Sequence, residues 1–241
     1  MIIALAQTKS IKGDIEKNIK NHIRFIEKCA QFKVDLICFP ELSLTGYEPQ
    51  LAEQFGTNPE DSRLMVLQEK SKLYKMIIAC GAPLAIEDKR YISMFIYQPN
   101  VQPIVYNKQI LHEDEIPFFA EGTQQVMIKT HDLRIAPAIC YESVQTSHFE
   151  HAVSIGCQVY LASAAKPQNA VSKAKGYFKN LSKGSALPVL FCNAIGACDD
   201  FISAGQSAVW YNGNQLAVLD STNEGLILFN TDLKTAKCTT L

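Results

Sequence analysis

Short apolar runs rich in Ile, Val, Leu, Phe and Tyr recur along the whole chain, and turn-forming residues separate them. Runs of this length and composition are typical of β-strands. Some are apolar at consecutive positions, as in DLICF and PVLFC, which indicates strands that are covered on both faces of a sheet. The pattern predicts strands at residues 2–8, 35–41, 76–82, 91–99, 103–109, 133–140, 158–164, 188–196, 205–211, 215–220 and 224–230.

Helical periodicity is clearest at about residues 15–31, where Ile15, Ile19, Ile23 and Ile26 form an apolar stripe between charged positions. The same kind of spacing predicts further helices at about residues 60–75, 145–156 and 169–186. Many strands and few helices favour two packed sheets with helices on their outer faces. No linker, low-complexity tract or block of charge divides the sequence. We therefore expect an α/β protein with a four-layer α-β-β-α sandwich, formed by a single domain over residues 1–241.

The composition argues against some classes of partner. The 241 residues are 47% apolar and carry a formal charge of −1, which gives no reason to expect nucleic acid or an anionic membrane as a partner. The longest apolar run, MIIACGAPLAI, is too short to span a bilayer and is interrupted by Gly81 and Pro83. No basic residue precedes the apolar stretch at the amino terminus, so it does not resemble a signal peptide. We expect a soluble cytoplasmic protein.

The chain has eight cysteines, at positions 29, 38, 80, 140, 157, 192, 198 and 238. Most lie inside apolar runs, where thiols pack as small hydrophobic groups, and without an export signal we expect no disulfides. His148 and His151 have the spacing of two metal ligands on one helix face, but no third ligand follows at a suitable spacing. We therefore predict that the protein has no metal site.

Three polar residues interrupt the apolar pattern at comparable positions, where predicted strands end. Glu41 follows DLICFP, Lys108 ends PIVYNK, and Cys140 ends RIAPAIC. Loops at strand ends are the usual place for sites in sheet-based enzymes. Each residue alone has an ordinary explanation, because a strand-end Glu or Lys is commonly solvated and a strand-end Cys commonly packs in a core. Together they make chemical sense: a thiol needs a base to become a nucleophile, and a nearby lysine stabilises a thiolate and then an oxyanion.

These three segments resemble the motifs of the nitrilase superfamily, the carbon–nitrogen hydrolases, and they occur in the family's order. FPELSLTGY is similar to the family's glutamate motif, YNKQILHEDE to its lysine motif, and PAICYES to its cysteine motif. The resemblance continues through VYLASAAK, VLFCNAIG and AGQSAVW, so it covers nearly the whole chain. It implies the four-layer fold of the amidase-like branch. By position, it makes Glu41 the general base, Lys108 the catalytic lysine and Cys140 the nucleophile, without a cofactor.

The family's second glutamate orients the lysine and the substrate, and the resemblance places it on Glu115. Glu113 and Glu142 are rival positions for that role. The chain also departs from the family pattern. Ala136 stands where many members carry Gly, and the Arg and FPE that often follow the cysteine motif are absent from CYESVQTSH. These departures leave the catalytic set intact, but they weaken any transfer of a particular substrate.

The implied activity is hydrolysis of a non-peptide carbon–nitrogen bond in a small linear amide or carbamoyl compound. A cysteine acyl-thioester forms, and ammonia and a carboxylic acid are released. The backbone N–H of Tyr141 is the expected oxyanion donor beside Lys108. Candidates for the substrate pocket are Tyr47, Phe118, Phe119, Ser163 and Lys166. A nitrile substrate, an acyl transferase of the same fold and a non-catalytic binding protein remain alternatives, and a homodimer is expected by resemblance.

Overall fold

The computed structural model describes residues 1–58, 60–130 and 133–241. Its larger sheet is mixed, with β1 (Ile2–Gln7), β2 (Leu36–Cys38) and β3 (Ile77–Ile86) parallel to one another and the other neighbours antiparallel. Within the described residues this sheet has seven strands, in the order β15 (Thr235–Thr239), β14 (Gly225–Asn230), β1 (Ile2–Gln7), β2 (Leu36–Cys38), β3 (Ile77–Ile86), β4 (Lys89–Tyr97) and β5 (Ile104–Asn107).

The second sheet is also mixed, and its strands β7 (Arg134–Ile139), β8 (Val159–Ala164) and β9 (Val189–Asn193) are parallel. Over the same described ranges its six strands have the order β13 (Asn214–Val218), β12 (Ala208–Tyr211), β9 (Val189–Asn193), β8 (Val159–Ala164), β7 (Arg134–Ile139) and β6 (Ile128–Lys129). A separate two-stranded hairpin pairs β10 (Ile195–Cys198) with β11 (Phe201–Ala204).

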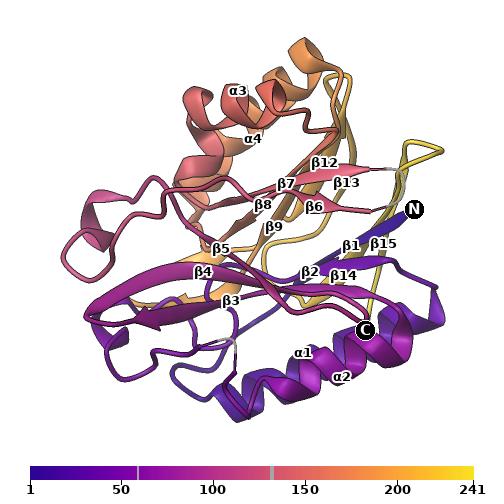
Figure 1. Ribbon diagram of the computed structural model, residues 1–241. Coiled ribbons are helices and arrows are strands. Elements are labelled where there is room, and N and C mark those ends of the chain that lie inside the picture. Colours follow the sequence, from indigo (N-terminus) through magenta and orange to yellow (C-terminus); the bar gives the residue numbers. More distant parts are fainter. Residues whose placement is uncertain (59, 131–132) are drawn as a thin grey trace.

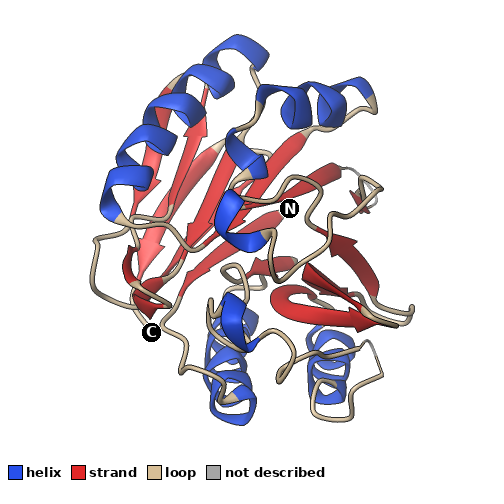
Figure 2. Ribbon diagram, turned by 90° about the vertical axis from the view of Figure 1, so that its left-hand side faces the viewer, coloured by secondary structure: helices blue, strands red, loops and turns tan. Residues whose placement is uncertain are grey.

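The helices form two outer layers around the stacked sheets. Helices α1 (Ile15–Gln31) and α2 (Met65–Tyr74) lie against the first sheet, and α3 (Thr146–Ser154) and α4 (Gln168–Ser185) lie against the second (Figures 1 and 2). The predicted α/β fold with α-β-β-α layering is therefore confirmed. None of the described helices has the length and apolar character needed to cross a membrane.

The alternation of side chains in β1 shows how the layers are held together. Ile3 and Leu5 belong to the core between the two sheets, whereas Ala4 and Ala6 pack with the stripe of α1. All four are fully buried, because successive strand residues point to opposite faces and both faces are covered. An all-apolar strand is thus the sequence signature of an inner layer.

Most predicted elements are present, with shifted ends. The helix expected at about residues 60–75 begins only at Met65. The segment before it forms a turn, in which the Asp61 carboxylate accepts the backbone N–H of Arg63 at 3.0 Å. The strand expected at 76–82 continues to Ile86 and pairs with β4 as a hairpin. The run expected at 188–196 divides into β9 and β10.

The sequence patterns did not predict β6, β11 or β15. These strands are short, or they alternate polar with small residues, as TAKCT does in β15. Both β6 and β15 lie at a sheet edge, and β15 is mostly exposed on both faces. An edge strand buries little apolar surface, so its pairing leaves no strong hydrophobic pattern in the sequence.

Candidate active site

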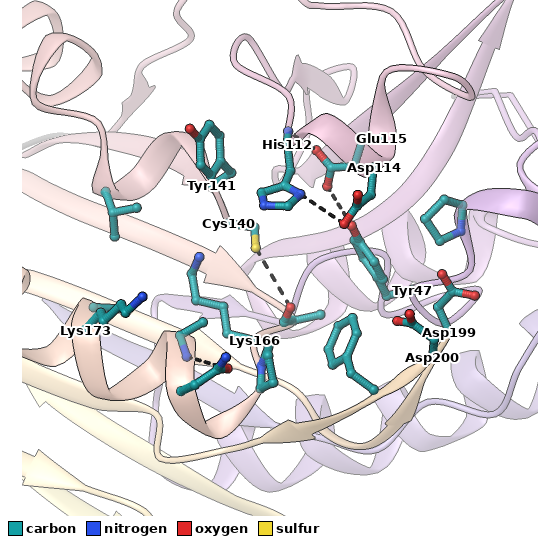
Figure 3. A pocket seen from close by; sticks show the side chains of 18 of the residues that line it. Tyr47, His112, Asp114, Glu115, Cys140, Tyr141, Lys166, Lys173, Asp199 and Asp200 are labelled. Atoms are coloured by element: carbon teal, nitrogen blue, oxygen red, sulfur yellow. Dashed lines mark hydrogen bonds and ion pairs between the residues drawn. The ribbon is translucent and has the colours of Figure 1, made fainter.

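The predicted strand-end residues converge between the two sheets. Glu41 lies in the loop after β2, Lys108 directly follows β5, and Cys140 directly follows β7. The first two strands belong to one sheet and β7 to the other, so the stacking of the sheets brings these residues together. A cavity of about 510 Å³ opens beside them, and Cys140 and Glu115 are among the residues that line it (Figure 3).

The loop that carries Glu41 is held close against strand β3. A Cβ atom added at Gly81 would lie 2.3 Å from the backbone nitrogen of Leu42, so glycine is required for this approach. The backbone N–H groups of Phe39 and Leu44 donate to Ala79 and Gly81 on β3, at 2.8 and 2.9 Å. Backbone contacts on both sides therefore fix the direction of the Glu41 side chain.

Lys108 is fully buried between two carboxylates. Its Nζ donates to Glu41 Oε1 at 2.9 Å and to Glu115 Oε1 at 2.6 Å. Glu115 is held in turn by the Tyr47 hydroxyl, which donates to Oε1 at 2.9 Å, and by the His112 backbone N–H, which donates to Oε2 at 2.7 Å. The structure thus brings Glu115 to the lysine, while the rival Glu113 is exposed on the same turn.

The surroundings of Lys108 and Glu41 shift the proton affinities of these two groups. Burial opposes the charge on Lys108, but Glu41 and Glu115 outweigh it and raise the pKa of this lysine above its ordinary value. Burial also raises the pKa of Glu41, and Lys108 opposes that rise. Lys108 therefore remains an ammonium ion, and Glu41 has a greater proton affinity than an exposed glutamate.

Cys140 occupies a strained turn at the end of β7. Its φ angle is +50°, in the left-handed region that side chains other than glycine seldom adopt. Its backbone N–H donates to Ser163 O at 2.8 Å, which ties the turn to β8. Burial raises the pKa of the thiol to about 11, and Glu41 adds to the rise, while Lys166 and Lys108 oppose it. At neutral pH the thiol is protonated, so it needs a base in order to react.

The residue after Cys140 offers a free hydrogen-bond donor. Tyr141 lines the cavity, and in the described part of the chain no backbone or side-chain group accepts a hydrogen bond from its N–H. A backbone N–H and a lysine ammonium near one cavity wall are the kind of pair that stabilises an oxyanion.

Glu142, the other rival for the second glutamate, is part of a separate buried network. Its Oε1 accepts hydrogen bonds from the Tyr106 hydroxyl at 2.6 Å and the Ile139 N–H at 2.7 Å, and its Oε2 accepts from the N–H groups of Gln109 at 2.6 Å and Ile110 at 3.2 Å. Burial raises its pKa to about 7, although these hydrogen bonds favour the carboxylate. Glu142 thus connects the cysteine turn to the loop after Lys108.

His148 extends this network and is not arranged as a metal ligand. Its Nε2 is 2.8 Å from the Tyr106 hydroxyl, and its Nδ1 is 2.8 Å from the Tyr160 hydroxyl, so both ring nitrogens are engaged. His151 is exposed on the same helix. Among the described residues, no group of three or more His, Cys, Asp or Glu side chains could hold a metal ion.

We expect Glu142→Gln to destabilise the protein. The amide nitrogen would replace an oxygen that accepts two hydrogen bonds, so donors would face donors in a buried site. Leaving buried donors unsatisfied costs about 1–3 kcal/mol each in the free energy of unfolding. Urea unfolding at pH 8, where Glu142 is ionised, would measure the loss. Glu150→Gln, on the exposed face of α3, is the matched control, and equal stability of the two variants would contradict this role.

Of the residues predicted to form the substrate pocket, some line the cavity in the structure and others lie elsewhere. Tyr47 and Lys166 line the cavity. Phe118 is 39% exposed and Phe119 is buried, and both line a second hollow on another side of the η2 turn (Glu113–Glu115). Ser163 is buried, and its hydroxyl donates to Phe39 O at 2.9 Å, so it joins the two sheets and does not line the cavity.

Several other residues line the cavity wall, and the sequence patterns did not predict them. Lys173 and Tyr177 reach it from α4, and Asp199, Asp200 and Phe201 reach it from the β10–β11 hairpin (Figure 3). The hairpin was not predicted, and the periodicity that predicted a helix at about residues 169–186 did not indicate which part of the fold it covers, so no sequence signal placed either element near Cys140.

Comparison with known proteins gives matches over almost the whole chain. A family model described as Carbon-nitrogen hydrolase matches residues 2–239. A glutamine-dependent NAD(+) synthetase from Aquifex aeolicus is 26% identical over 246 residues, which cover 98% of this chain and 43% of the relative. A probable nitrilase from Schizosaccharomyces pombe is 24% identical over 253 residues, which cover 98% of this chain and 90% of the relative. The chain thus spans less than half the length of the NAD(+) synthetase.

The fold is similar to that of a solved amidase. A variant of the amidase from Nesterenkonia sp. AN1, with the acetamide moiety of fluoroacetamide added covalently at its active-site cysteine, matches with a TM-score of 0.86 and 19% identity. The match covers 95% of this chain and 89% of that one. The family model spans almost every residue, and the chain therefore belongs to the carbon–nitrogen hydrolase family.

Proposed function

We propose that the protein hydrolyses the carbon–nitrogen bond of a small linear amide or carbamoyl compound, with Cys140 as nucleophile. The observation that carries the proposal is the buried Lys108, held between Glu41 and Glu115 next to a cavity that Cys140 lines. A binding protein has no need of a buried ammonium and two carboxylates beside a protonated thiol. A cysteine hydrolase has a use for each of them.

In the first half of the reaction, Glu41 accepts the thiol proton as Cys140 Sγ attacks the amide carbon. The carbonyl electron pair moves to oxygen, and this oxyanion is stabilised by the Lys108 ammonium and the Tyr141 N–H. The tetrahedral intermediate collapses as Glu41 returns the proton to the leaving nitrogen. Ammonia departs and an acyl-thioester remains on Cys140.

In the second half, water attacks the thioester carbon and Glu41 accepts its proton. The same donors stabilise the second oxyanion. When this intermediate collapses, the carbon–sulfur bond breaks, the thiolate regains the proton, and the carboxylic acid is released. Each step uses groups of this chain and water alone. The covalent adduct at the active-site cysteine of the Nesterenkonia amidase supports a nucleophilic cysteine here.

The proposal is tested by measuring ammonia release from a panel of amides and carbamoyl compounds. We expect turnover of at least one class and, when hydroxylamine competes with water, formation of the matching hydroxamate. Intact mass spectrometry of a quenched reaction should show one acyl group, which peptide mapping places on Cys140. Ammonia release without any acyl-enzyme or hydroxamate would contradict the covalent route, and no turnover of any compound would contradict the hydrolase.

A second candidate is hydrolysis of glutamine as a source of ammonia. Curated relatives that match over nearly all of this chain are glutamine-dependent NAD(+) synthetases, although the chain spans less than half of their length. Including glutamine and asparagine in the amide panel tests this candidate directly. A kcat/KM for glutamine well above that of every simple amide would favour it.

A further inference from the structure

Lys166 projects into the cavity from the segment between β8 and α4. Its backbone is fixed, because its N–H donates to Asn193 Oδ1 at 2.8 Å and its carbonyl accepts from Asn193 Nδ2 at 3.2 Å and from the Ala204 N–H at 2.9 Å. The residue is only 7% exposed and lines the cavity with Cys140. The side chain extends from this anchored backbone into the space drawn in Figure 3.

Within the described residues, the ammonium group of Lys166 has no hydrogen-bond or ion-pair partner. The hydrogen bonds of this residue use its backbone atoms, and across residues 1–58, 60–130 and 133–241 no carboxylate forms an ion pair with it. Lys108, the other buried lysine of the site, has two carboxylate partners. A buried ammonium without a counter-ion is costly, so the cavity is built to receive an anion beside it.

We propose that Lys166 binds a carboxylate of the substrate, so that the enzyme acts on monoamides of dicarboxylic acids in preference to neutral alkyl amides. This inference rests on the proposed amide hydrolysis and names its substrate class. Lysine and carboxylate form a charge-assisted hydrogen bond, which is stronger in a buried site than at the surface. Such an anchor would hold the far end of the substrate while the amide carbon lies at Cys140.

Lys166 could instead act on the reaction itself, by stabilising the Cys140 thiolate in every turnover. In the resting enzyme the thiol is neutral, so it does not supply the missing negative charge. The two roles also differ in what they predict. A thiolate-stabilising lysine affects all amides equally, whereas a carboxylate anchor affects only those amides that carry a carboxylate.

The test uses pairs of amides of equal chain length, one with a terminal carboxylate and one with a methyl group. The pairs are succinamate with butyramide, glutaramate with pentanamide, and adipamate with hexanamide. We expect the wild-type enzyme to prefer the anionic member of at least one pair by about 100-fold in kcat/KM, mainly through KM. Equal rates, or faster turnover of the neutral member in all three pairs, would overturn the inference while leaving amide hydrolysis intact.

The Lys166→Met variant removes the charge and keeps the length of the side chain. We expect kcat/KM for the anionic amide to fall far more than kcat/KM for the neutral one, so that the preference for the anionic amide is lost. Lys179→Met, on the exposed side of α4, makes the same change of net charge away from the cavity and should behave as wild type. An equal loss of kcat for both members of a pair would show that Lys166 serves the chemistry and not the carboxylate.

A binding measurement separates this inference from activity and from folding. Glutarate, a dicarboxylate without an amide, should inhibit turnover of the neutral amide by the wild-type enzyme and should inhibit Lys166→Met far less. Lys166→Arg, which keeps the charge, should retain the inhibition, and circular dichroism should show that both variants are folded. If no amide is hydrolysed, the proposed function fails. Calorimetry with glutarate then still tests whether Lys166 binds an anion. Glutarate binding that is unchanged in Lys166→Met would refute the anion site.

Discussion

Cys140→Ala is expected to abolish amide turnover, because the acyl group then has no atom on which to form. The variant should release no ammonia above background and should give no hydroxamate in the presence of hydroxylamine. The cavity should still bind substrate, because the loss of one sulfur atom leaves its other walls in place. Steady-state ammonia release measures the first effect, and calorimetry with an amide measures the second.

Cys38→Ala and Cys80→Ala are the matched controls for this experiment. Both thiols are fully buried in strands of the first sheet, and neither lines the cavity. Their loss removes packing contacts and should reduce the free energy of unfolding by about 1 kcal/mol each, with kcat unchanged. Turnover that survives in Cys140→Ala, or that is lost in either control, would refute the proposed mechanism.

Glu41→Gln is expected to lower kcat by about 10²–10⁴-fold, the usual contribution of a positioned general base. The amide keeps the size of the side chain but cannot accept a proton. Alkylation of Cys140 by iodoacetamide should slow as well, because the buried thiol loses its proton acceptor. Ammonia release and alkylation rate, measured on the same preparation, test both halves of this expectation.

The pH profile gives a further test of Glu41. The carboxylate is the active form, so kcat/KM should fall as the pH is lowered through the pKa of Glu41. Burial raises that pKa, so the acid limb should lie at a higher pH than for an exposed glutamate. In Glu41→Gln this limb should disappear from the residual activity. An unchanged acid limb in the variant would assign the titration to another group.

Variants of the other two glutamates distinguish general base catalysis from positioning. Glu115→Gln should impair turnover, since Glu115 holds the Lys108 ammonium at 2.6 Å, but it should change the alkylation rate less than Glu41→Gln does. Glu113→Gln replaces an exposed side chain two positions away and should be silent. An inactive Glu113→Gln beside an active Glu115→Gln would move the second glutamate to position 113.

The order of apolar and polar residues along the chain is enough to predict the layers of this fold and the segments that carry its chemistry. Consecutive apolar residues, as in the strand that contains Ile3 and Ala4, marked inner strands because both faces of such a strand must be covered. The apolar stripe that begins at Ile15 marked an outer helix. Glu41, Lys108 and Cys140 were identifiable because each interrupts an apolar run at its end, and because their motifs resemble an ordered family set. These are local signals, and a single sequence contains them.

Which side chains contact one another follows from the folded arrangement and could not be predicted from the motifs. Glu113, Glu115 and Glu142 are all compatible with the sequence motifs, but only Glu115 has its oxygen against Lys108, while Glu142 accepts four hydrogen bonds under the cysteine turn. Phe118 follows the same motif yet lies on another surface. Lys166 was one of several possible pocket residues until its burial and its unpaired ammonium were visible. The physical reason is that these contacts join loops from two sheets and a hairpin, and their geometry is set by how the sheets stack and not by spacing along the chain.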